Sequence, residues 1–60
     1  MGNSSEVIAG WIDLVNTEGR GLTEWELGFM ESITEQFERS GSLSNRQEEI
    51  LERIYAEKTP

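Results

Sequence analysis

Two glycine-containing turns, at residues 18–21 and near Gly41, divide this 60-residue chain into three short segments. In each segment apolar residues recur at the three- and four-residue spacing of one helix face, and the alternation that indicates a strand is missing. A chain of this length holds one small domain. We therefore expect a single acidic helical domain over residues 1–60 with an all-α fold. It is either a small three-helix bundle or a helical hairpin with a docked N-terminal helix.

Each segment also begins with a residue that can cap a helix, followed three positions later by Glu or Gln, which is the spacing of a capping box. The first helix is expected to span residues 4–17 and to end at Gly19, acting as a left-handed C-terminal cap. The expected cap and partner pairs are Asn3 with Glu6, Thr23 with Glu26, and Ser44 with Gln47.

The core is expected to be small and rich in aromatic side chains. Only 35% of the residues are apolar, against roughly 45–50% in a typical domain, an average that also counts glycine. The aromatic residues predicted to lie in the core are Trp11, Trp25, Phe29 and Phe37. On the first helix the apolar residues fill an arc of about 160°, which is more than two short helices cover. We therefore expect Leu14 and Val15 to form an exposed apolar edge that contacts a partner or a second copy of the chain.

Acidic residues dominate the surface, because 12 acidic side chains against 5 basic ones give a net charge of −7. This charge opposes direct binding to nucleic acid or to an anionic membrane and favours a protein partner with a basic surface. On the second helix four carboxylates fall within about 60° of one another, opposite the apolar stripe. They are Glu24, Glu31, Glu35 and Glu38. This carboxylate ridge spans about 21 Å. It is either an imitation of nucleic-acid phosphates or the solvated face of an amphipathic helix.

The residue types needed for common catalytic and metal sites are missing from the sequence. The chain has no Cys and no His, which excludes a disulfide scaffold, a zinc finger and catalysis by thiolate or imidazole. We therefore expect neither an enzyme nor a site for a cofactor or metal. Apolar runs long enough for a signal peptide or a membrane span are also missing, so a cytoplasmic location is expected.

Residues 22–57 carry a pattern that resembles small phage and prophage proteins. The pattern consists of Trp25, Glu26, Phe29, Ser32 and Ile33, followed by Leu43, Ser44, Gln47, Ile50, Leu51, Ile54 and Tyr55. Because these are mainly cap and core positions, the resemblance implies a shared fold and a phage origin. In size and acidity the chain is also similar to anti-CRISPR proteins as a group.

Together these features predict a phage-encoded, anti-CRISPR-like inhibitor that occupies a basic surface of a nucleic-acid-processing complex. The expected mechanism is steric and electrostatic competition without turnover. Two alternatives stay open: an accessory module of phage DNA metabolism that recruits its partner without inhibiting it, and a structural homodimer whose apolar first-helix edge completes its core.

Overall fold

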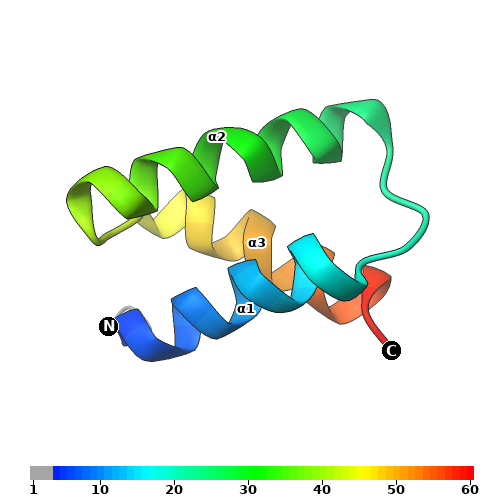
Figure 1. The fold of residues 1–60 in the computed structure, drawn as a ribbon, viewed down its shortest axis with the longest axis horizontal. Helices are drawn as coiled ribbons and strands as arrows, with labels where there is room; N and C mark the ends of the chain where they lie inside the picture. Colours follow the sequence, from blue (N-terminus) through cyan, green and yellow to red (C-terminus); the bar gives the residue numbers. More distant parts are fainter. Residues whose placement is uncertain (1–3) are drawn as a thin grey trace.

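The computed structural model describes residues 4–60 and folds them into three α-helices (Figure 1). The helices are α1 (Ser5–Glu18), α2 (Glu24–Ser40) and α3 (Asn45–Lys58). Each helix contacts the other two, and α1 packs more extensively on α3 than on α2. In Figure 1, α3 crosses behind α1 and α2. The all-α prediction is confirmed, and the architecture is the three-helix bundle. No strand occurs within residues 4–60.

Capping boxes fix the first turns of α2 and α3. The Thr23 hydroxyl accepts a hydrogen bond of 3.1 Å from the backbone N–H of Glu26, and the Glu26 carboxylate accepts one of 2.8 Å from the Thr23 N–H. Ser44 and Gln47 repeat this arrangement, with distances of 3.2 and 2.9 Å. Both boxes are therefore confirmed, and each satisfies two backbone donors that the helix itself leaves unpaired.

The start of α1 differs from its prediction. Ser4 is the N-cap, and its hydroxyl accepts a hydrogen bond of 3.3 Å from the backbone N–H of Val7. The predicted cap, Asn3, lies outside the described residues, and assigning the cap to that position was wrong. With the cap at Ser4, Glu6 stands only two positions later, one short of the position that a capping box requires. Glu6 still places an acidic side chain in the first turn, where the helix dipole favours it.

The end of α1 also differs from its prediction, because Gly19 is not left-handed. Its backbone is extended, with φ −67° and ψ 140°, while its N–H donates to the Val15 carbonyl. A Cβ at this position would collide with that same carbonyl oxygen, which explains the need for glycine in steric terms. The left-handed turn comes two residues later, at Gly21, and a second one at Gly41 ends α2.

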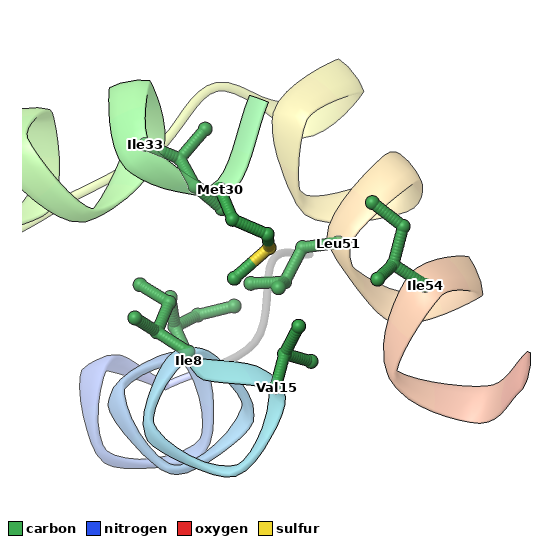
Figure 2. Packing of buried hydrophobic residues seen from close by; sticks show 7 residues of the cluster. Ile8, Val15, Met30, Ile33, Leu51 and Ile54 are labelled. Atoms are coloured by element: carbon green, nitrogen blue, oxygen red, sulfur yellow. The ribbon is translucent and has the colours of Figure 1, made fainter. Parts of the chain in front are cut away.

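The core consists of aliphatic side chains and one methionine, contributed by all three helices (Figure 2). The buried residues are Ile8, Ile12, Val15, Met30, Ile33, Leu51 and Ile54. Figure 2 shows Val15, Met30 and Leu51 pointing toward one another across the bundle. The predicted exposed edge is therefore wrong at Val15, which is only 3% exposed, and Leu14 beside it is half-buried.

The aromatic residues lie at the margin of this core, not at its centre. Trp11, Phe29 and Phe37 are half-buried and pack against it. Trp11 stacks on Tyr55 with 5.6 Å between ring centroids, which joins α1 to α3. The prediction that Trp25 is a core residue was wrong, because this residue is 63% exposed. It lies in the first turn of α2, at the edge of the apolar stripe, and stacks on Phe29 instead.

Replacing Thr23 by Ala should lower the free energy of unfolding by about 1 kcal/mol, because the backbone N–H of Glu26 loses its acceptor. Urea unfolding followed by circular dichroism measures this loss. Thr23→Ser keeps the hydroxyl and should stay close to wild type. An equal loss in the Ala and Ser variants would mean that the threonine methyl group, not the cap, carries the stabilisation.

A polar cluster fastens the α1–α2 loop to the end of α3. The backbone N–H of Arg20 donates to the Lys58 carbonyl at 2.8 Å, and Lys58 Nζ donates to the Gly21 carbonyl at 3.2 Å. Lys58 Nζ also lies 3.7 Å from a Glu26 carboxylate oxygen. The hydrogen bond from the Thr23 N–H lowers the pKa of Glu26, and the Lys58 charge lowers it further, while partial desolvation opposes both.

The lowered pKa of Glu26 predicts a pH-dependent contribution to stability. Because the folded carboxylate stays charged to lower pH than the unfolded one, its contribution is complete above the unfolded pKa of about 4.3. It is lost as the pH falls through the folded pKa. We expect Glu26→Gln to melt below wild type at pH 7 and the two melting temperatures to converge as the pH falls below the folded pKa of Glu26. A gap that does not change with pH would contradict this assignment.

Candidate functional site

The carboxylate ridge of Glu24, Glu31, Glu35 and Glu38 lies in solvent along α2, and all four residues are exposed. Glu35 pairs with Arg39 one turn later at 3.1 Å, and both of these side chains are largely in water. Such a pair contributes little stability, so it is easily exchanged for a partner's cation. The other three carboxylates form no ion pair within residues 4–60. Periodicity therefore placed the ridge on the correct face.

An open groove runs between α1 and α2 and meets the edge of this ridge. Its larger part is a hollow of about 620 Å³, and a second hollow of about 260 Å³ lies between the same two helices. The apolar residues lining the α1–α2 groove are Ala9, Ile12, Val15, Leu22, Leu27, Met30 and Phe37. Its acidic residues are Asp13, Glu31, Glu35 and Glu38. Three ridge carboxylates thus belong to the groove as well, and Glu24 does not.

Short side chains on the facing sides of α1 and α2 account for this groove. Asn16 of α1 donates a hydrogen bond of 3.0 Å to the Thr34 hydroxyl of α2, and both residues line both hollows. The Thr34 hydroxyl in turn donates to the Met30 carbonyl of its own helix at 2.6 Å. Ala9 adds another small side chain on α1. Small and polar residues cannot fill the space that the large apolar residues fill between α1 and α3.

The groove is negatively charged along both of its sides. Asp13 lines it from α1, and Glu31 and Glu38 line it from α2. None of the residues that line either hollow is Lys or Arg. An apolar floor between acidic edges is complementary to a ligand that is apolar on one side and cationic on its flanks.

Leu27 is one of the groove residues that sequence reasoning missed. This residue is 57% exposed although its side chain is large and apolar. At 100° per residue it lies off the apolar stripe of α2 and close to the direction of Thr34 and Glu31. That offset was the available signal, but only the position of α1 shows that these side chains line a shared groove. Of the predicted α1 edge, Val15 lies at the base of this groove, and Leu14 does not line it.

The described part of the chain contains no group of three or more His, Cys, Asp or Glu side chains that could hold a metal ion. None of its helices has the length and apolarity needed to cross a membrane. No family model, curated protein sequence or solved structure matches the chain. The resemblance to phage proteins therefore stays a prediction, and the charge and shape of the surface are the observations that bear on function.

Proposed function

We propose that this protein binds a basic, nucleic-acid-binding surface of another protein and inhibits it by competition. The observation that carries the proposal is the exposed carboxylate ridge of α2, in which three of the four charges have no ion-pair partner among residues 4–60. Carboxylates without an ion-pair partner do not have to break an internal ion pair before they bind a cationic surface. Their long-range attraction also speeds the encounter of the two proteins.

The spacing of the ridge supports competition with nucleic acid. Glu31 and Glu35 are one helical turn apart, about 6 Å along the axis, and Glu24 to Glu38 covers about 21 Å. A DNA strand carries one charge for each 3.4 Å or so of helix axis, so the ridge presents a comparable row at lower density. A partner surface that binds DNA phosphates would thus contact negative charges over a comparable length of the ridge.

The proposal includes a phage origin and inhibition of the partner, as by anti-CRISPR proteins. Both rest on the pattern in residues 22–57 and on the size and acidity of the chain. Burial of Val15 removes half of the apolar edge on which the homodimer alternative depended. The recruiting module differs from the inhibitor in outcome alone, because its partner would stay active in the complex.

Capture from a nuclease-treated bacterial lysate tests the proposal. Wild-type protein and the Glu31→Lys, Glu35→Lys double variant are immobilised in parallel, and the retained proteins are identified by mass spectrometry. We expect the wild type to retain a nucleic-acid-binding protein that elutes with salt and that the variant does not retain. Adding free wild-type protein to the purified partner should then lower its activity. Unchanged activity would favour recruitment, and equal retention by both baits would contradict a role for the ridge.

A further inference from the structure

We infer that the α1–α2 groove binds a cationic amphipathic helix of the partner protein, with the apolar face of that helix on the groove floor. This inference rests on the proposed function, because it takes the partner to be basic. It specifies which part of the partner binds, namely a helix, and where on this protein it binds, namely the α1–α2 groove. The ridge alone attracts any positive surface, whereas the groove selects for shape and for an apolar stripe.

The length of the groove matches about three turns of a helix. On α2 the lining residues run from Leu27 to Glu38, which are eleven positions apart, and at 1.5 Å per residue this is about 16 Å. On α1 they run from Ala9 to Gly19, ten positions apart, or about 15 Å. A partner segment of about eleven helical residues therefore spans both hollows, passing over the hydrogen bond that links α1 to α2 at their junction.

The floor offers contacts that an apolar helix face can use. Leu27 is 57% exposed and half-buried Leu22 also lines the groove, so covering them removes apolar surface from water. Met30 lies deeper, and its flexible thioether can adapt to the shape of an incoming side chain. Amphipathic helices that bind in grooves use apolar anchors at i, i+3, i+4 and i+7, and this groove is long enough for such a set.

The negative charge of the groove determines which class of helix it binds. Acidic side chains occur on both sides of the groove, with Asp13 on α1 and Glu31 and Glu38 on α2. A partner helix that carries Lys or Arg on both flanks of its apolar stripe meets opposite charge on each side. A second copy of this chain, at −7, meets like charge, and so does nucleic acid. The occupant we assign is therefore a cationic helix of another protein.

Fluorescence anisotropy with two labelled synthetic peptides of fifteen residues tests this inference. Both contain the same Leu and Lys residues. In one, Leu recurs at i, i+3, i+4 and i+7, and in the other the same Leu residues are spread around the helix. We expect the patterned peptide to bind wild-type protein at least tenfold more tightly than the scrambled one. Equal affinity would overturn the groove inference, while salt-sensitive binding of both would leave the proposed function standing.

A matched pair of variants locates the binding. Leu27 and Trp25 are both exposed apolar residues of α2, but their directions differ by about 160° and only Leu27 lines the groove. Leu27→Ala should weaken binding of the patterned peptide at least fivefold, and Trp25→Ala should leave it within twofold of wild type. The reverse order would place the peptide on the Trp25–Phe29 side and overturn the inference. If neither peptide binds while the lysate partner does, the groove inference fails and the proposed function survives.

Discussion

Replacing Leu51 by Ala is expected to unfold a substantial fraction of the protein in water at 25 °C. Leu51 is fully buried between the helices, and truncating such a side chain costs about 2–5 kcal/mol. A domain of 60 residues with one small core is stable by no more than about 3–5 kcal/mol. The substitution therefore removes a large part of the total, or all of it. Urea unfolding at several temperatures measures the loss.

Leu27→Ala is the matched control, since it makes the same chemical change at an exposed position of α2. Leu27 keeps 57% of its surface in water, so the expected loss is well below that at Leu51. The Leu27 variant also gains slightly from the higher helix propensity of Ala. Comparable losses at Leu27 and Leu51 would contradict the assignment of the core to the aliphatic cluster.

The Glu31→Lys, Glu35→Lys double variant is expected to associate with the basic partner at least tenfold more slowly than wild type. Each substitution changes the charge by +2, so the net charge goes from −7 to −3, and the change is concentrated on the ridge. Loss of long-range attraction acts mainly on the association rate, and the difference should shrink as salt screens the charges. Stopped-flow or surface-based kinetics at several salt concentrations give this rate.

A variant of equal net charge separates the ridge from the overall charge of the protein. Glu49→Lys with Glu52→Lys also gives −3, but places the new charges on exposed positions of α3. It should associate much faster than the ridge variant and nearly as fast as wild type at physiological salt. The free energies of unfolding of both double variants should lie within about 1 kcal/mol of the wild-type value, because each exposed substitution changes it by no more than about 0.5 kcal/mol. Equal slowing in the two variants would mean that net charge alone guides the encounter.

Local signals predicted most of the fold. The boxes formed by Thr23 with Glu26 and by Ser44 with Gln47 act over three residues, so their chemistry is complete within the segment that carries them. Helical periodicity also placed Ile33 on the buried face of α2. At Gly19 the prediction failed because the left-handed residue of this turn is Gly21, and the sequence does not indicate which of the two glycines takes that conformation.

The failures at Val15 and Trp25 share one cause: burial is set by a neighbouring helix, not by the helix that carries the residue. The apolar arc of α1 was too wide to indicate which of its parts faces α3, and Val15 proved to be central. Trp25 sits in the first turn of α2, where no other helix covers it. The α1–α2 groove was missed for the same reason, since Leu27 and Asn16 come together only when the two helices pack.

Competition with DNA for the captured partner shows whether the acidic protein displaces nucleic acid. A labelled DNA duplex is bound to the partner, and the acidic protein is titrated in while anisotropy reports the DNA that remains bound. We predict that anisotropy falls to the value of free DNA as the protein saturates its partner, and that the Glu31→Lys, Glu35→Lys variant needs a much higher concentration. If anisotropy instead stays constant or rises while the protein binds, both ligands occupy the partner together, and the account of inhibition by competition is contradicted.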